Sequence, residues 1–216
     1  MENINMKKRN YTEFIIMRHG QSTADVEKPK RFEGSVDNPL TKKGKEQARL
    51  AGLWIAEHCP PQRIISSPLI RAEETARVIA EKIDVDIEID ERLQERKNGI
   101  LGGLTEAEAD AKDLLPLSKY KPDETAPKGE SLIELRARAE TFWSKMLNQS
   151  KAGQRILIVS HGQMIAMLFR CLLNLPTDES IRFATDDTGI HSWQLDEKGW
   201  KIVFTNSREH LQKMTK

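Results

Sequence analysis

Short apolar runs alternate along the chain with longer amphipathic segments, and this alternation predicts strands separated by helices. Residues 14–17 (FIIM), 63–67 (RIISS) and 155–160 (RILIVS) have the length of strands and contain few charged positions. Such runs are typical of strands buried on both faces of a parallel sheet. Residues 85–90 (VDIEID) alternate between apolar and acidic side chains, so a further strand is expected there.

Helix signals lie between these runs. Thr41 is predicted to cap an amphipathic helix that ends near His58. Pro68 is well placed to open the next helix, which we expect to reach about Ile83. These two helices would connect the first three predicted strands.

The second half of the chain continues the alternation. A helix is predicted from Ser131, because apolar residues then recur every three or four positions, at Leu132, Leu135, Ala139, Phe142 and Met146. The apolar stretch from about Gly162 predicts a buried helix. Two β-rich runs surround a Glu-Lys-Gly turn within residues 191–206 and predict an antiparallel hairpin.

Strands and helices in this order predict an α/β sandwich with a mostly parallel central sheet and one antiparallel edge. We expect residues 1–12 to form a flexible N-terminal tail and residues 13–211 to form a single domain. Residues 98–130 are irregular, with a short helix expected around 105–115, and are predicted to pass over the main body of the domain.

Composition limits the classes of function. The net charge of +1 over 216 residues gives no overall field for a nucleic acid or an anionic membrane surface, so any anion site must be local. The most apolar run, Met164–Leu175, is too short to span a bilayer and contains Arg170. Cys59 and Cys171 have no metal-site spacing, and a disulfide framework is not expected from two cysteines. A reducing, cytoplasmic setting is therefore predicted. We expect neither nucleic acid nor membrane as a partner.

Chemically active side chains follow the ends of four predicted strands. Arg18 and His19 follow the first strand, and Arg71 lies in the first turn of the helix after the second. Glu95 follows the third strand and His161 follows the strand at 155–160. In open α/β sheets ligands bind beyond the carboxyl ends of the strands. Each residue is a weak signal alone, but together they predict one site.

Two histidines and a glutamate could form a metal triad. Arg18 and Arg71 argue against this, because fixed cations oppose a divalent metal and favour a phosphate dianion. Helix N-termini near Arg71 and His161 would add to anion binding. Neither a Walker-type glycine loop nor an aspartate pair for magnesium is visible. The residues therefore favour phosphoryl transfer without a metal.

In that chemistry a neutral His19 attacks phosphorus and forms a phosphohistidine. Arg18, Arg71 and His161 would stabilise the equatorial oxygens. Glu95 would protonate the leaving alcohol and then activate water, so burial or the phosphate charge should raise its pKa. A glycine after His19, Gly20, is expected to keep the turn slim enough for the substrate to approach.

Seven ordered sequence blocks carry a resemblance to a known family. They are RHGQS (18–22), RFEGSVDNPLTKKG (31–44), SSPLIRAEETA (66–76), LQERKNGILGGL (93–104), GES (129–131), VSHG (159–162) and NSREHL (206–211). With these blocks the chain resembles the histidine phosphatase superfamily, in its phosphoglycerate mutase-like branch, from about residue 13 to 211. The resemblance implies a three-layer α/β/α fold, a site covered by the 98–130 segment, and no metal or nucleotide cofactor.

The resemblance implies His19 as the phosphorylated residue and Glu95 as the proton donor, with Arg18, Arg71 and His161 completing the phosphate pocket. Further contacts to the substrate are expected from Ser22, Asp25, Glu33, Gly34, Arg96 and Gly162. For Arg96 a solvated position is an equally good interpretation.

The chain also departs from the family pattern. Asp25 stands where many members have an asparagine that donates to phosphate, which an ionised carboxylate cannot do. We expect Asp25 either to point away or to contact a cationic or hydroxyl group of the substrate. Glu33 stands where a neutral polar residue is common, and Asn98 replaces an aromatic residue of the mutases.

The segment between Glu95 and Gly129 is shorter than in glycolytic mutases, which favours access of water to the phosphohistidine. We therefore predict a phosphatase that hydrolyses phosphomonoesters of small metabolites. A phosphoglycerate mutase is the first alternative, and a catalytically weak module that binds phosphorylated ligands or a protein is the second. The oligomeric state cannot be predicted from the sequence.

Overall fold

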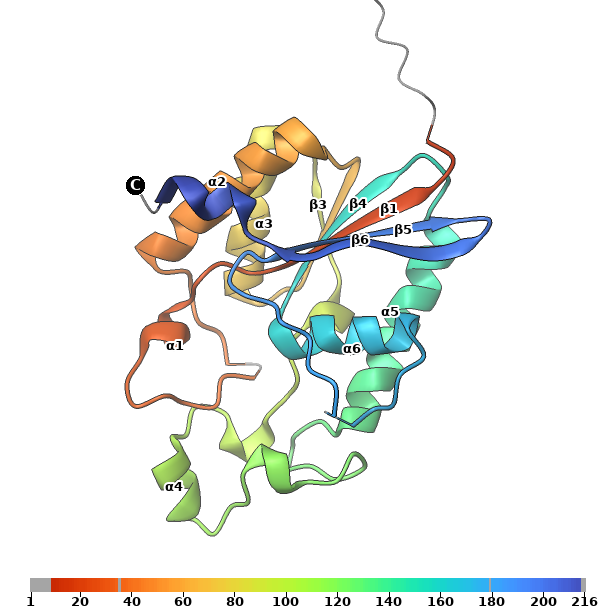
Figure 1. Ribbon diagram of the computed structural model, residues 1–216. Helices are drawn as coiled ribbons and strands as arrows, with labels where there is room; N and C mark the ends of the chain where they lie inside the picture. Colours follow the sequence, from red (N-terminus) through yellow and green to blue (C-terminus); the bar gives the residue numbers. More distant parts are fainter. Residues whose placement is uncertain (1–8, 35, 179, 215–216) are drawn as a thin grey trace, which may run out of the picture.

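The computed structural model describes residues 9–34, 36–178 and 180–214 (Figure 1). Within these residues the chain forms a six-stranded sheet with the strand order β3-β2-β4-β1-β5-β6. The strands are β1 (Thr12–Arg18), β2 (Arg63–Ser66), β3 (Ile87–Ile89), β4 (Arg155–Ser160), β5 (Ile190–Asp196) and β6 (Gly199–Ser207). The longer helices are α2 (Lys42–His58), α3 (Ile70–Ile83), α5 (Leu132–Gln149) and α6 (Gly162–Leu172).

The sheet is mostly parallel, as the alternation of strands and helices predicts. Strand β4 pairs in parallel with both β1 and β2, and β2 pairs in parallel with β3. Strand β5 runs antiparallel to β1 and forms the predicted hairpin with β6. The hairpin therefore forms the one antiparallel side of the sheet. The carboxyl ends of the four parallel strands lie together at one end of the sheet.

Alternate residues of the central strands fill two separate cores. On one face Ile15 and Met17 pack with α2 and α3, and on the other Phe14 and Ile16 pack with α5 and α6. Figure 1 shows these helix pairs on opposite sides of the sheet. Because both faces are covered, strands β1 and β4 are buried at nearly every position, and their central residues are all apolar. The three-layer α/β/α fold is confirmed.

Helix caps place two of the helices where the sequence predicts them. Thr41 accepts a hydrogen bond from the backbone N–H of Gly44 at 3.0 Å, and α2 begins at the next residue. Ser131 accepts from the N–H of Glu134 at 3.2 Å and starts α5 in the same way. The third helix, α3, begins at Ile70 rather than at Pro68, because Leu69 is still extended.

Residues 98–130, here named the cap, cover the carboxyl edge of the sheet with short elements. Helix α4 (Glu106–Asp110) is shorter than the helix expected around 105–115. A small core of Leu101, Ala109 and Ala126 holds the cap together, and Phe32 and Leu117 pack against it. In Figure 1 the cap with α4 lies below the sheet.

The sequence did not predict helix α1 (Thr23–Val26) or the 3-10 helix η4 (Glu209–Met214), whose short lengths leave no periodic signal. Strand β1 already begins at Thr12, so the last residue of the expected N-terminal tail belongs to the sheet. Residues 1–8 of that tail lie outside the described part of the chain. None of the helices in the described residues is long and apolar enough to cross a membrane.

Candidate active site

A cavity of about 470 Å³ opens at the carboxyl edge of the parallel strands, between the cap, α6 and the segment that precedes β5. Six residues predicted for the site line it, namely Arg18, His19, Glu33, Gly34, Glu95 and Gly162. Arg71 and His161 lie directly behind them, with exposed fractions of 1% and 0%. The structure thus brings together all five side chains that follow the strand ends.

His19 is held in one tautomer. Its Nδ1 donates to the carbonyl oxygen of Gly20 at 2.7 Å, and its Nε2 accepts from the Nε–H of Arg71 at 3.2 Å. The proton is therefore on Nδ1, and the lone pair is on Nε2. Burial lowers the pKa of His19 to about 3, with help from the charges of Arg18 and Arg71. At neutral pH the imidazole is uncharged.

Arg71 is anchored by the loop that precedes α2. Its two terminal nitrogens donate to the carbonyl oxygens of Val36 and Gly34, each at 2.9 Å, which leaves Nε to face His19. Burial lowers the pKa of Arg71, and the nearby Glu95 and Glu33 oppose this shift. Gly34 contributes to the site mainly through its carbonyl oxygen.

His161 lies beside His19, with 5.1 Å between the ring centroids. Its Nε2 is 2.8 Å from the hydroxyl oxygen of Ser67, and its buried Nδ1 has no hydrogen-bond partner among the described residues. Burial is the main reason why the pKa of His161 lies well below its usual value, and His19, Arg71 and Arg18 lower it further. Two neutral imidazoles therefore stand side by side.

Glu95 caps the N-terminus of α6. One carboxylate oxygen accepts from the N–H of Met164 at 3.2 Å and of Arg96 at 2.9 Å, and the other accepts from the N–H of Gln163 at 3.1 Å. These bonds fix the carboxylate on the cavity wall, next to Gly162.

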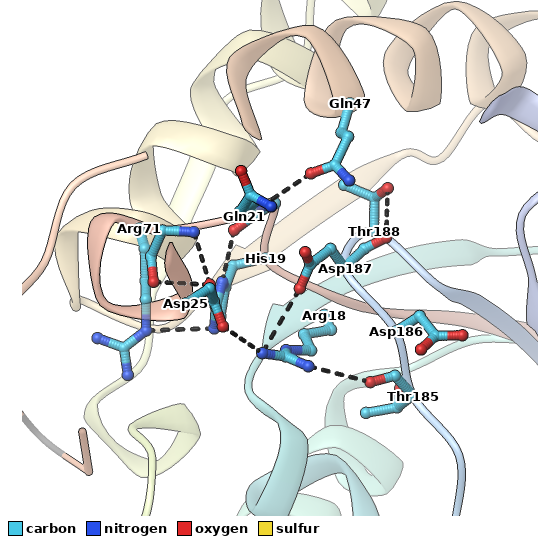
Figure 2. A network of polar contacts seen from close by, with 12 residues as sticks. Arg18, His19, Gln21, Asp25, Gln47, Arg71, Thr185, Asp186, Asp187 and Thr188 are labelled. Atoms are coloured by element: carbon cyan, nitrogen blue, oxygen red, sulfur yellow. Dashed lines mark hydrogen bonds and ion pairs between the residues drawn. The ribbon is translucent and has the colours of Figure 1, made fainter. Parts of the chain in front are cut away.

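Arg18 is flanked by two carboxylates (Figure 2). Its Nη2 is 3.0 Å from Oδ1 of Asp25 and 3.5 Å from Oδ1 of Asp187, and its Nη1 donates to the carbonyl oxygen of Thr185 at 3.3 Å. Asp25 thus contacts a cation of the protein, an arrangement outside the two alternatives expected from the sequence. Its carboxylate also accepts from the N–H and hydroxyl of Ser22 at 2.6 and 2.7 Å.

Several expected contacts have another use in the structure. Ser22 is fully buried and gives its hydroxyl hydrogen to Asp25. Arg96 is 3% exposed, so it is not solvated, and its Nε donates to the carbonyl oxygen of Glu130. A Cβ atom at Gly20 would lie 2.6 Å from the carbonyl oxygen of Gly44. The glycine is therefore required by the close approach of α2, whatever it contributes to substrate access.

Glu33 and Asn98 both line the cavity, as their positions in the sequence blocks suggest. Burial raises the pKa of Glu33, and the negative charge of Asp25 adds to this rise. Sequence reasoning missed Ser67, Thr185 and Asp187. Ser67 ends the predicted strand at 63–67 and could have been noticed there, whereas the segment around Asp187 gives no periodic or motif signal.

Among the described residues, no three His, Cys, Asp or Glu side chains are grouped so that they could hold a metal ion. The charged groups nearest to His19 are the two arginines, Arg18 and Arg71. A small site with one buried and one partly exposed arginine, two neutral imidazoles and a helix-capping carboxylate is suited to phosphoryl groups.

An α/β sandwich with this site defines the class of phosphoryl-transfer enzymes that work through histidine. Residues 14–208 match the family model of the histidine phosphatase superfamily (branch 1), and the chain belongs to that family. A 2,3-bisphosphoglycerate-dependent phosphoglycerate mutase 2 of Gloeobacter violaceus is 34% identical over 76% of this chain and 77% of its own length. A protein of Enterobacter sp. named as a probable phosphoglycerate mutase is 33% identical over 91% of this chain and 93% of its own length.

Three solved structures illustrate the shared fold, and two of them are named as phosphatases. Bacillus stearothermophilus YhfR is 27% identical with a TM-score of 0.79, covering 93% of this chain and 100% of its own. A mycobacterial glucosyl-3-phosphoglycerate phosphatase is 25% identical with a TM-score of 0.76, over 91% and 99% of the two chains. The α-ribazole phosphatase of Shigella flexneri has a TM-score of 0.81 at 24% identity, over 91% and 96%. The family thus includes mutases and phosphatases.

Proposed function

We propose that this chain is a metal-independent phosphatase that hydrolyses phosphomonoesters of small metabolites through a phosphohistidine at His19. The observation that carries the proposal is the fixed tautomer of His19, whose Nε2 lone pair belongs to an uncharged ring on the cavity wall. A neutral imidazole is the form that attacks phosphorus. With a pKa of about 3, His19 keeps this form throughout the physiological range.

The reaction then has two displacements. In the first, Nε2 of His19 forms a bond to phosphorus while the bond from phosphorus to the ester oxygen breaks, and Glu95 gives the departing oxygen its proton. In the second, Glu95 takes a proton from water, whose oxygen displaces His19 and releases inorganic phosphate. Arg18, Arg71 and His161 would balance the charge on the phosphoryl oxygens in both steps.

The far wall of the cavity supports an organic, weakly charged leaving group. It is formed by apolar side chains from the cap, α5, α6 and the segment before β5, namely Leu117, Leu132, Leu135, Met167, Ile181 and Phe183. Two cations that also line the cavity already have partners. Arg31 pairs with Glu27 and Glu108, and Arg170 donates to the carbonyl oxygen of Ile181. This lining suits an alkyl or aryl group better than a second phosphate.

A phosphoglycerate mutase is the second candidate, and the two relatives named as mutases favour it. A mutase must keep water away from the phosphohistidine and bind the carboxylate of the glycerate. Lys30 and Arg182 line the cavity and could contact such a carboxylate, but both are solvent-exposed. An exposed ion pair contributes only about 0–1 kcal/mol. The short cap and the apolar wall therefore make hydrolysis the better proposal.

The first test is a screen of phosphomonoesters for phosphate release by the purified chain. We expect His19→Ala to lower kcat/KM by more than about 1,000-fold, because the nucleophile is lost. His58→Ala is the matched control, since His58 is exposed and, within the described residues, its hydrogen bond is to the carbonyl oxygen of Trp54 in the same helix. Equal activity of His19→Ala and the control would overturn the mechanism.

Two further measurements separate the alternatives. Acid-labile phosphate on His19, trapped during turnover, would argue against a mere binding module, and its absence with every substrate would favour that role. Interconversion of 2- and 3-phosphoglycerate that depends on the bisphosphate, with slower phosphate release, would replace hydrolysis by the mutase reaction.

A further inference from the structure

Arg18 lies between two carboxylates that differ in how firmly they are held. Oδ1 of Asp25 is 3.0 Å from Nη2 of Arg18, while the other oxygen of Asp25 is fixed by the N–H and the hydroxyl of Ser22. Asp187 makes one polar side-chain contact within the described residues, the ion pair with Arg18 at 3.5 Å. Figure 2 shows both carboxylates directed at the same guanidinium.

The backbone around Asp187 is fastened on both sides. Thr188 donates its N–H to the carbonyl oxygen of His19 at 3.2 Å, and its hydroxyl bonds His210 at 2.9 Å. Asp186 is tied to Asn206 through its own N–H and its carboxylate, both at 2.9 Å. Thr188 has a φ of +53°, which is strained for a β-branched residue. Asp187 is therefore held beside Arg18 and has little room to move away.

The two carboxylates also differ in their affinity for protons. Burial favours a higher pKa for Asp25, but the bonds from Ser22 and the charge of Arg18 outweigh it and leave the pKa below its usual value. Burial raises the pKa of Asp187, and Asp25 and Asp186 add to this against the charges of Arg18 and Lys43. Asp187 is the carboxylate that takes up a proton more readily.

A phosphate dianion bound to Arg18 would meet both carboxylates at short range, and like charges in a partly buried site repel strongly. Relief has to come from the carboxylate that is less firmly held. The fastened backbone keeps Asp187 near Arg18, so uptake of a proton by its carboxylate removes the repulsion without a rearrangement of the chain. The groups that face it are Arg18 on β1, Asp25 on α1, Lys43 on α2 and its neighbour Asp186. His210 of η4 hydrogen-bonds the adjacent Thr188.

We propose that Asp187 is a positioning residue that competes with phosphate for Arg18, so that anion binding is coupled to the uptake of one proton by the Asp187 carboxylate. The inference rests on the proposed phosphate site at Arg18. In the free enzyme Asp187 holds the guanidinium in place, and in the complex the protonated carboxyl group leaves Arg18 to the anion. Phosphate and phosphomonoesters would then bind more weakly as the pH rises.

The test is the binding of inorganic phosphate, followed by isothermal titration calorimetry at pH 5.5 to 8 without turnover. Asp187→Asn and Asp187→Ala should bind phosphate about 10-fold more tightly than the unmodified chain at pH 8, and this advantage should shrink as the pH falls toward 5.5. The alanine variant adds no new hydrogen-bond donor, so its gain isolates loss of the charge. The protonation of free phosphate is the same in every titration and cancels in the ratio of variant to unmodified affinity. The change of that ratio with pH therefore reports the carboxylate of Asp187.

Asp186→Asn is the matched control. Asp186 is the neighbouring acidic residue, but it bonds Asn206 and Arg208 and not Arg18, and it is the smallest of the causes that raise the pKa of Asp187. Its variant should therefore change phosphate affinity far less than Asp187→Asn does. In buffers of different ionisation enthalpy at pH 6, the unmodified chain should take up more protons on binding than Asp187→Asn does. The proposal is overturned if the ratio of phosphate affinities between the Asp187 variants and the unmodified chain does not change with pH. It is also overturned if both Asp187 variants bind phosphate more weakly. Failure of phosphate to bind any of the proteins overturns the proposed phosphate site as well.

Discussion

The hydroxyl group of Ser67 determines which ring nitrogen of His161 carries the proton. Its oxygen accepts from the N–H of Leu69 at 3.3 Å and lies 2.8 Å from Nε2 of His161. We infer that the hydroxyl donates to Nε2, because this direction leaves a donor on Nδ1 for a phosphoryl oxygen. The proton of His161 then lies on Nδ1, which is buried without a partner in the described chain. An unpaired buried donor costs about 1–3 kcal/mol. A phosphoryl oxygen is the partner that this donor suits.

Replacing Ser67 should weaken catalysis without removing any group that contacts the substrate. In Ser67→Ala, His161 can place its proton on Nε2 and turn a lone pair toward the phosphate, so we expect kcat/KM to fall about 10-fold. Steady-state kinetics with one phosphomonoester would measure this. Ser66→Ala is the control, because Ser66 is equally buried and its hydroxyl bonds Ser67 rather than His161. Equal losses in the two variants would show that the tautomer is unimportant.

For single residues of the site, the sequence predicts those that follow strand ends and misses those that act through a neighbouring side chain. Arg18, His19 and His161 are found because a parallel sheet brings the carboxyl ends of its strands together. Ser67 and Asp187 are missed because their roles depend on single contacts at 2.8 and 3.5 Å, which spacing along the chain does not encode.

At the scale of the elements, the cap determines the shape of the cavity beyond the phosphate. Its 3-10 helix η3 (Leu117–Lys119) places Leu117 on the cavity wall, opposite the apolar residues of α5 and α6. The main strands were predictable as short apolar runs, and helices α2 and α5 were predictable from the caps at Thr41 and Ser131. The path of residues 98–130 was not, because a core as small as Leu101, Ala109 and Ala126 leaves no periodicity.

A polar residue in the cap wall should change substrate preference and leave the chemistry intact. We expect Leu117→Asn to lower kcat/KM for an aryl phosphate such as phenyl phosphate by about 10-fold, because a buried apolar contact is lost. The value for glycerol phosphate, which is too polar to use that wall, should stay within about twofold.

The control for this change lies two residues away. Leu115 is 55% exposed and does not line the cavity, so Leu115→Asn should leave both substrates unaffected. If Leu117→Asn lowers the values for both substrates equally, the cap has been disrupted and the apolar wall does not set the preference.

At the scale of the whole molecule, four of the five histidines are buried in uncharged form. Burial lowers the pKa of His191 and of His210 to about 4, and His19 and His161 are lowered by burial and by the neighbouring cations. His191 illustrates the arrangement, because its Nδ1 accepts from the N–H of Asn206 at 3.0 Å and its Nε2 bonds Thr185 at 2.6 Å. Protonation of Nδ1 would break the first of these bonds.

The chain should therefore lose stability in mild acid. The folded-state pKa of each of these histidines lies below the unfolded value of about 6.5, so the unfolded chain binds more protons between pH 6.5 and pH 4. Each histidine then removes up to about 1.4 kcal/mol per pH unit as the pH falls. We expect His191 and His210 together to reduce the free energy of unfolding by about 4 kcal/mol between pH 6.5 and 4.5. Glu33 and Asp187 have the opposite effect on stability, because their pKa values are raised in the folded chain. They stabilise the fold as the pH falls from the raised pKa to the ordinary pKa of a carboxyl group.

Urea unfolding followed by tryptophan fluorescence at a series of pH values would measure this slope. His210→Gln offers a direct check, since glutamine can keep a bond to the hydroxyl of Thr188 but cannot titrate. Its free energy of unfolding should fall less steeply between pH 6.5 and 4.5 than that of the unmodified chain. The difference in slope should equal the contribution of one titrating histidine. His58→Gln changes an exposed histidine and should leave the slope unchanged. Parallel curves for the unmodified chain and His210→Gln would mean that this buried histidine does not control the acid sensitivity.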